Sequence, residues 1–219
     1  KISNMQENIV LLVIIGINVL MSWKGFEDMN FFRTYEFHIG SIQSGDQKRM
    51  ITSGFLHADI AHLAFNMIAL YSFGNVIIET IGNLFFLTTY FASLLLGNLL
   101  TLYFHKHNYG YRAVGASGAV TGILYSAILM YPNMQISLFF IPIGIPAYIF
   151  GFIYLLYSIY GMKAQNDNIG HTAHIGGALA GFAFTLFKVP SLFVTNTFIV
   201  VLLLIPIVFL FIIAQRGKI

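Results

Sequence analysis

Cysteine is absent from the 219-residue chain, which excludes disulfide frameworks, thiolate zinc sites, iron–sulfur clusters and cysteine nucleophiles together. Charge is also scarce, because Asp, Glu, Lys and Arg make up only 9% of the residues, about a third of the share in an average soluble domain. This argues against a soluble globule and in favour of lipid as the solvent. High hydrophobicity with a net charge of +3 argues against disorder. No basic run is longer than Lys48-Arg49, so the sequence offers nucleic acid no phosphate-binding track.

The sequence is rich instead in apolar residues, which make up 58% of the chain and form long uncharged stretches. A transmembrane helix needs about 20 mostly apolar residues, and the turn signal Tyr131-Pro132-Asn133 divides the longest stretch in two. We therefore expect an all-α polytopic membrane protein, a single domain over residues 1–219, with seven transmembrane helices. The expected spans are residues 8–23, 60–78, 82–104, 115–131, 136–160, 172–187 and 191–213. The first span is not expected to be a signal peptide, because no small-residue cleavage site follows it.

The connections after the first, third and fifth spans hold most of the polar residues and fall on one side of the membrane. They cover residues 24–49, 105–112 and 161–172. Together with the C-terminus they hold nine Lys and Arg residues, whereas the opposite side holds Lys1 and Lys188. The positive-inside rule alone places these polar connections in the cytoplasm. This asymmetry predicts that the functional site lies on the side of the membrane that carries the polar connections.

Polar side chains within spans are costly unless they are buried in the bundle, so each is a functional candidate. The head of the second span carries His62 and Asn66, which are four residues apart and therefore lie on one face of a helix. His57 precedes them and lies at or before the helix start. Asp59 is placed as an N-cap that accepts from the free first-turn amides.

A serine between glycines begins the fourth span. Gly115 and Gly118 flank Ser117, and Gly118 with Gly122 forms a face of small residues that permits close helix packing. A serine at a loop-to-helix junction is unobstructed, and the helix N-terminus offers backbone amides to an oxyanion. The pattern also fits a packing motif with no chemistry.

A histidine lies above a matching glycine face in the sixth span. Gly177 and Gly181 are four residues apart, and His174 lies three residues before Gly177. If the two glycine faces dock, the fourth and sixth spans approach closely and Ser117 meets His174. His171 is a second candidate base, but it lies in the polar connection and off the glycine face. A lone histidine in a span is also commonly a packing residue.

The remaining ionisable groups discriminate between mechanisms. The zinc-protease motif His-Glu-x-x-His is absent, and His105-Lys-His107 fits a solvated loop better than a metal site because no cysteine or carboxylate is close in the sequence. An aspartyl membrane protease needs two acids within the spans, and none is clearly available. A full Ser-His-Asp triad lacks an obvious buried acid, because Asp59 and Asp167 lie at the membrane edge and Glu79 at the far end. The residues therefore allow a serine–histidine pair without a third member.

These motifs resemble those of the rhomboid family of intramembrane serine proteases. The matching residues are His57-x4-His62-x3-Asn66, Gly115-x-Ser117-Gly118 and Ala173-His174-x-x-Gly177-x3-Gly181. The resemblance covers about residues 5–190, and the span at 191–213 matches a variant with one helix after a six-helix core. It implies that Ser117 is the nucleophile and His174 its general base. It also implies that His62, Asn66 and the Ser117 backbone amide donate hydrogen bonds to the oxyanion.

The resemblance also assigns supporting roles. It implies that His57 links the second span to the first connection, that Gly115 lets the backbone approach the substrate, and that Gly177 and Gly181 seat the sixth span against the fourth. Arg49 matches an arginine usually preceded by tryptophan, but Lys48 stands in that place here. Thr121 stands where some members carry an aromatic side chain that stacks on the catalytic histidine. These departures concern the anchoring of the first connection and the orientation of His174.

The implied function is an intramembrane serine endopeptidase that cleaves transmembrane segments through an acyl-enzyme. Its expected partners are the lipid bilayer and transmembrane proteins with helix-destabilising residues near the scissile bond, and it needs no cofactor, metal or nucleic acid. Residues 161–172 and the fifth span are the expected gate. The family implies a site open to the outside of a prokaryotic plasma membrane, against the Lys and Arg distribution. One alternative is an inactive relative that binds membrane helices. Another is a transporter or metal carrier, against which the sequence shows neither intramembrane carboxylates nor an inverted repeat.

Overall fold

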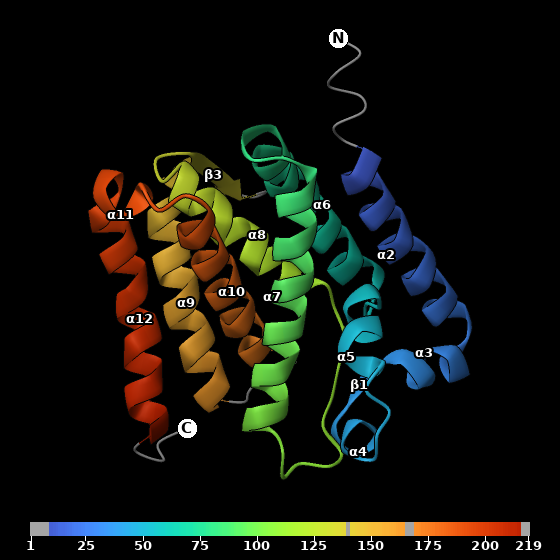
Figure 1. The fold of residues 1–219 in the computed structure, drawn as a ribbon. Helices are drawn as coiled ribbons and strands as arrows, with labels where there is room; N and C mark the ends of the chain where they lie inside the picture. The colour runs from blue at the N-terminus through green and yellow to red at the C-terminus, as the bar shows by residue number, and fades with distance from the viewer. Residues whose placement is uncertain (1–8, 139–140, 165–168, 216–219) are drawn as a thin grey trace.

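The computed structural model describes residues 9–138, 141–164 and 169–215, and within them it is an all-α bundle. Seven helices of these described residues are 14 or more residues long and follow the order of the seven expected spans. They are α2 (Ile9–Glu27), α6 (Ile60–Thr80), α7 (Asn83–Phe104), α8 (Ser117–Met130), α9 (Ala147–Ala164), α10 (His171–Lys188) and α12 (Thr197–Gln215). The predicted fold class, a helical bundle of membrane-spanning type, is confirmed (Figure 1).

Length and composition support membrane spanning most directly for four helices of the described chain, namely α2, α6, α7 and α12. Helix α8 is apolar but has only 14 residues, which rise about 21 Å at 1.5 Å per residue. Helix α10 carries histidines and glycines in its first half and is correspondingly less apolar. The total of seven spans therefore remains a prediction.

The predicted fifth span, residues 136–160, is wrong at its beginning. A β-hairpin of β3 (Gln135–Leu138) and β4 (Ile141–Pro146) precedes α9, which begins only at Ala147. The segment Ile141-Pro142-Ile143-Gly144-Ile145-Pro146 alternates β-branched residues with proline and glycine, which favour extended backbone and disfavour a helix interior. Hydropathy alone did not separate this apolar hairpin from the helix behind it.

The polar connections gather at one end of the bundle, the lower end in Figure 1. The first connection folds into α3 (Met29–Tyr35), β1 (Phe37–His38), α4 (Ile39–Gln43), α5 (Arg49–Thr52) and the 3₁₀ turn η1 (Ser53–Phe55). The third connection contributes β2 (Arg112–Ala113), which pairs antiparallel with β1. The connection after the fifth span was expected at residues 161–172 as part of the gate. Its residues 161–164 belong to α9 and 171–172 to α10, while 165–168 lie outside the described residues. The opposite end carries the hairpin and α11 (Leu192–Thr195).

Helix α8 lies in the middle of the bundle, and its residues 118–129 are all buried (Figure 1). Glycines bring α7, α8 and α10 close together around it. A β-carbon on Gly176 of α10 would lie 2.7 Å from Gly97 Cα of α7, and one on Gly177 would meet the backbone of Gly118 on α8. Such close approach needs residues without side chains. The tight packing holds the beginning of α8 against the beginning of α10.

Candidate active site

Ser117 is the first residue of α8, at the polar end of the bundle. Gly115 before it has a φ of +132°, in the left-handed region that favours glycine. A β-carbon at Gly115 would also lie 2.8 Å from the His62 ring. The backbone amide of Gly115 donates to the Ser53 carbonyl oxygen (3.0 Å). The segment before the serine is therefore held by its backbone, and the serine side chain is left half-buried rather than covered.

His174 lies in the first turn of α10 and meets Ser117. Its Nε2 lies 2.7 Å from Ser117 Oγ, and only 7% of the residue is exposed. The glycine faces dock as their spacing predicted, because Gly177 and Gly181 face the backbone of Gly118 and Gly122. A serine hydroxyl bonded to an imidazole nitrogen is the arrangement in which the histidine can remove the hydroxyl proton.

His171, the second candidate base, lies beside this pair. Its ring centre is 6.1 Å from that of His174 and 5.3 Å from that of Tyr157. The residue is 4% exposed and packs against Gly161 of α9. The hydrogen bond to Ser117 Oγ is formed by His174.

His62 and Asn66 come from α6, whose N-cap Asp59 accepts from the His62 backbone amide (2.7 Å), as its position predicted. The His62 ring and Ser117 Oγ both lie within 4 Å of the point where a Gly115 β-carbon would be. Asn66 is 7% exposed, and its Nδ2 donates to the His62 carbonyl oxygen (3.0 Å). The His62 ring therefore lies beside the serine, and Asn66 lies one helical turn further along α6.

His57 is fully buried and joins three segments of the chain. Its Nε2 accepts from the Ala116 backbone amide (3.3 Å), so its Nδ1 carries the proton and donates to Ser22 Oγ of α2 (2.8 Å). Ser22 Oγ in turn donates to the Phe55 carbonyl oxygen (3.1 Å). His57 thereby ties α2 and the first connection to the backbone next to Ser117, and Ser22 is a partner that the sequence did not indicate.

Burial lowers the pKa of His57 to about 3, with the nearby His62 adding to the effect. The native state therefore keeps His57 neutral while the unfolded state takes up a proton below about pH 6.5. We expect the His57 contribution to stability to be complete above pH 6.5 and to fall by about 4 kcal/mol as the pH drops to 3. Detergent-unfolding titrations across this pH range measure the slope.

The control is His57→Asn, which cannot titrate. His38 and His105, whose pKa values are also lowered chiefly by burial, contribute to the same slope in both proteins. The difference between the two slopes therefore reports His57 together with its coupling to the nearby His62. Identical slopes for the wild type and His57→Asn would contradict a neutral, buried His57.

Arg49 anchors the first connection although Lys48 replaces the expected tryptophan. The Arg49 side chain donates to the carbonyl oxygens of Arg33 (2.8 Å) and Glu36 (2.9 Å) and to Asp46 Oδ2 (2.8 Å). Lys48 Nζ lies 5.5 Å above the ring of Tyr35. Arg49, and not Lys48, therefore provides the anchors to the Arg33 and Glu36 backbone.

Glu36 is a buried carboxylate that the sequence analysis missed. It is 2% exposed and is paired with both Arg33 (3.1 Å) and Arg112. Arg112 lies in β2, so this ion pair and the β1–β2 ladder fasten the third connection to the first. The nearby Arg33, three positions earlier, gives an ordinary local pair, whereas Arg112, which ties Glu36 to the other connection, is 76 positions away.

Tyr154 of α9 is a second missed residue. Its Oη lies 2.8 Å from His174 Nδ1, and the two rings stack with centres 5.6 Å apart at 25°. The sequence predicted no aromatic partner for His174, because Thr121 occupies the position where such a residue was sought. The aromatic partner comes from another helix, and no spacing pattern in the sequence links it to His174.

A cavity of about 1000 Å³ opens at the polar end of the bundle, and His62, Val114 and His171 line it together with residues of the first and third connections. Val114 and His62 border the serine segment, so the cavity lies next to the site, although Ser117 and His174 are not among the residues that line it. His105 and Tyr111 both line the cavity, and their rings stack face to face with centres 3.9 Å apart.

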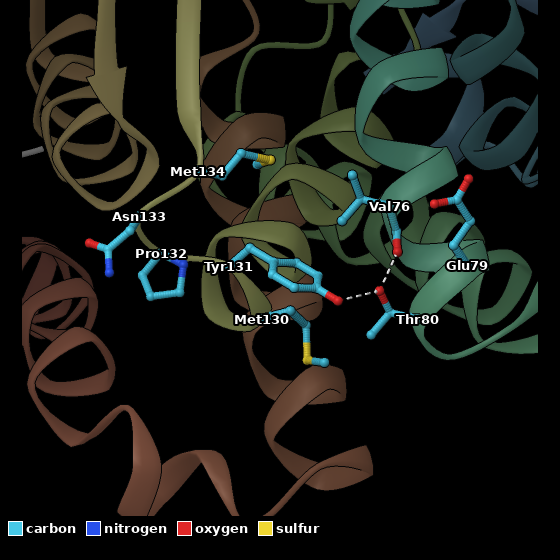
Figure 2. A pocket seen from close by; sticks show the side chains of 8 residues that line it. All are labelled: Val76, Glu79, Thr80, Met130, Tyr131, Pro132, Asn133 and Met134. Atoms are coloured by element: carbon cyan, nitrogen blue, oxygen red, sulfur yellow. Dashed lines mark hydrogen bonds between the residues drawn. The ribbon is translucent and has the colours of Figure 1, made fainter.

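A second cavity, of about 700 Å³, lies at the opposite end of α8. Figure 2 shows Glu79, Thr80 and Tyr131 around it, with the Tyr131 hydroxyl bonded to Thr80 Oγ1 (3.1 Å). Met130 ends α8 whereas Ser117 begins it, so about 20 Å of helix separates this cavity from the serine–histidine pair. The cavity in Figure 2 is therefore not the candidate active site.

Comparison with known proteins gives one family. The Rhomboid domain model matches residues 44–191. RHOMBOID-like protein 12, mitochondrial, of Arabidopsis thaliana is 32% identical over 183 residues, which cover 76% of this chain and 54% of that protein. Rhomboid protein 1, mitochondrial, of Saccharomyces cerevisiae is 30% identical over 62% of this chain and 40% of that protein.

A bacterial protein is similar as well. Rhomboid protease GluP of Bacillus subtilis is 34% identical over 141 residues, which cover 64% of this chain and 26% of that protein. This chain thus matches about half or less of the length of these curated relatives.

Proposed function

The chain belongs to the rhomboid family of integral, multi-pass membrane proteins, and we propose that it is an intramembrane serine endopeptidase working through a Ser117–His174 dyad. The observation that carries the proposal is the 2.7 Å hydrogen bond between Ser117 Oγ and His174 Nε2. Family membership supports an intramembrane protease-like function, and the pair supplies the chemistry for it. The mechanism needs neither a metal nor a cofactor.

In the proposed reaction Ser117 Oγ attacks the carbonyl carbon of the scissile peptide while His174 Nε2 takes the hydroxyl proton. The tetrahedral intermediate collapses as the imidazolium protonates the leaving amine, and an acyl-enzyme remains. Water then attacks the ester with His174 as base, which releases the acid and restores Ser117. The cavity at the polar end supplies this water.

The oxyanion lies between the Ser117 backbone amide at the beginning of α8, the His62 ring and the Asn66 amide in this proposal. An amide NH₂ has two hydrogens, so Asn66 can keep its bond to the His62 carbonyl and still donate to the substrate. A donor of this kind contributes about 3 kcal/mol to transition-state stabilisation. His57, Arg49 and Gly115 act indirectly, because they hold the backbone around the site.

The proposed substrates are transmembrane segments of other membrane proteins. A membrane helix protects its peptide bonds by its own hydrogen bonds, so the enzyme should favour helices with glycine, proline or other destabilising residues near the scissile bond. The lipid bilayer is the other partner. We further propose that residues 1–219 form one membrane domain, with a core of about residues 5–190 and an additional C-terminal helix.

The names of the relatives bear on which membrane holds the protein. The narrower expectation of a prokaryotic plasma membrane is not supported by the comparisons, because the Arabidopsis and yeast relatives are named mitochondrial. We propose that the site opens on the side that carries residues 105–112, away from Lys188. A protease-protection assay on that loop identifies the side.

A fluorophosphonate probe tests the proposal against its two alternatives. An activated serine should react covalently with the probe at Ser117, close to one label per chain, whereas an inactive relative that only binds membrane helices should not. Peptide mapping identifies the modified residue, and heat-denatured protein is the control. Absence of labelling in folded protein, or stoichiometric zinc by elemental analysis, would favour the alternatives.

A further inference from the structure

Tyr154 touches the proposed base from the side opposite to the nucleophile. His174 Nε2 faces Ser117 Oγ (2.7 Å), while Nδ1 faces Tyr154 Oη (2.8 Å). The two rings are nearly parallel, at 25°. Both imidazole nitrogens are therefore occupied, and the ring face is covered, by groups from two other helices.

The hydrogen bonds continue beyond Tyr154 and return to the serine. Tyr154 Oη lies 3.4 Å from Thr121 Oγ1, and Thr121 Oγ1 donates to the backbone carbonyl oxygen of Ser117 (2.7 Å). The series of hydrogen bonds thus runs from Ser117 to His174, Tyr154, Thr121 and back to Ser117. It closes a ring of four residues from α8, α9 and α10.

The Ser117 carbonyl oxygen sets the direction of the hydrogen bonds in this ring. A carbonyl oxygen can only accept, so the Thr121 hydroxyl hydrogen points at Ser117 and its oxygen is left to accept from Tyr154. This leaves an arrangement in which Tyr154 Oη donates to Thr121 Oγ1 and accepts from His174 Nδ1–H. Nδ1 carries the imidazole proton as a result, and Nε2 keeps the lone pair that a general base needs toward Ser117.

We propose that Tyr154 is the positioning residue of the dyad, and that Thr121 sets the direction of its hydrogen bond so that His174 is held in the base-competent tautomer. This inference rests on the proposed Ser117–His174 function and deepens it. Tyr154 fills the place that a carboxylate has in a serine triad, as a neutral acceptor that also stacks on the ring. The Nδ1–H bond remains available when His174 becomes an imidazolium.

Three substitutions separate the hydroxyl from the ring. Tyr154→Phe keeps the stacking and loses the acceptor, so kcat should fall about tenfold with KM unchanged. Tyr154→Leu loses both and should lower kcat about a hundredfold. Thr121→Val removes the hydroxyl that accepts from Tyr154 but keeps Tyr154 itself, and it should lower kcat about threefold. Thr121→Ser keeps this hydroxyl and should show the wild-type rate.

Tyr160→Phe is the matched control, because Tyr160 lies on the same helix and is 63% exposed. It should leave kcat and KM unchanged. Thermal unfolding of each variant in detergent identifies any loss of fold.

A nitrogen-15 NMR measurement on histidine-labelled protein reads the tautomer directly, with the His174 signals assigned by their loss in His174→Ala. The wild type should show protonated Nδ1 and unprotonated Nε2, and Tyr154→Phe should populate the opposite tautomer. An unchanged tautomer together with unchanged kcat in folded Tyr154→Phe would overturn this inference while the dyad stands. Wild-type protein that neither cleaves a model substrate nor reacts with a fluorophosphonate would overturn the dyad itself.

Discussion

Ser117→Ala should abolish cleavage of a model transmembrane substrate, lowering kcat/KM by at least about 10⁴-fold, while the protein remains folded. The substitution removes one oxygen atom, and the hydrogen bond lost with it is the one to His174 Nε2. Alanine is a good helix former, so the beginning of α8 should not suffer. The backbone amide of Ser117 is kept, so the loss reports the nucleophile rather than the oxyanion donor. Cleavage by purified, detergent-solubilised protein measures it.

His174→Ala should reduce the rate to the same level, and the double variant should be no slower than either single one. Residues that act as a unit show this non-additive behaviour, because the base has no task once the nucleophile is gone. His171→Gln is the matched control, since His171 lies beside His174 on α10 but is not the residue bonded to Ser117 Oγ. It should keep fluorophosphonate labelling at Ser117. Full activity of purified Ser117→Ala would show that another residue is the nucleophile.

The meeting of Ser117 with His174 could be predicted because it follows from helix periodicity. Gly118 and Gly122 on one helix, and Gly177 and Gly181 on another, each form a face at four-residue spacing. When Gly177 docks on Gly118 and Gly181 on Gly122, the residues just before each glycine face come together. The N-cap Asp59 was predictable for the same reason, since its acceptor role depends only on the first turn of its own helix.

Contacts between helices without such a face could not be predicted. Tyr154 reaches His174 because α9 packs beside α10, and nothing in the sequence distinguishes it from Tyr148, Tyr157 or Tyr160 on the same helix. Aromatic side chains in a bundle core are ordinary packing residues by composition. The register of one helix against another depends on the fit of the whole interface, so this partner appears only in the structure.

The hairpin before α9 was missed for a different reason. Hydropathy measures how apolar a segment is, and an apolar strand and an apolar helix give the same value. Pro142, Gly144 and Pro146 carried the information that the segment is extended. The turn signal at Tyr131-Pro132-Asn133 already divided the long uncharged stretch into two spans of suitable length. The second of these, residues 136–160, therefore included the three residues in a helix.

Gly177→Ala should destabilise the protein by about 2 kcal/mol and lower kcat about a hundredfold, although residue 177 touches no substrate in the proposed mechanism. Its β-carbon would lie 2.7 Å from the Gly118 carbonyl carbon and 3.2 Å from Gly118 Cα. Backbone cannot move aside as a side chain can, so α8 and α10 must separate. The 2.7 Å bond between Ser117 and His174 spans the same interface, and a displacement of about 1 Å is sufficient for such a loss of rate.

Gly16→Ala on α2 is the control for a glycine within a helix, because a β-carbon there would have no atom within 4 Å. It should stabilise the protein by about 0.5–1 kcal/mol, as alanine does in an unobstructed helix, and leave the rate unchanged. Detergent-unfolding titrations and substrate cleavage measure both variants. If Gly177→Ala lost activity but kept its stability, the effect would be local to His174. Wild-type values for both would contradict the close contact of α8 with α10, and with it the register that joins the serine to its histidine.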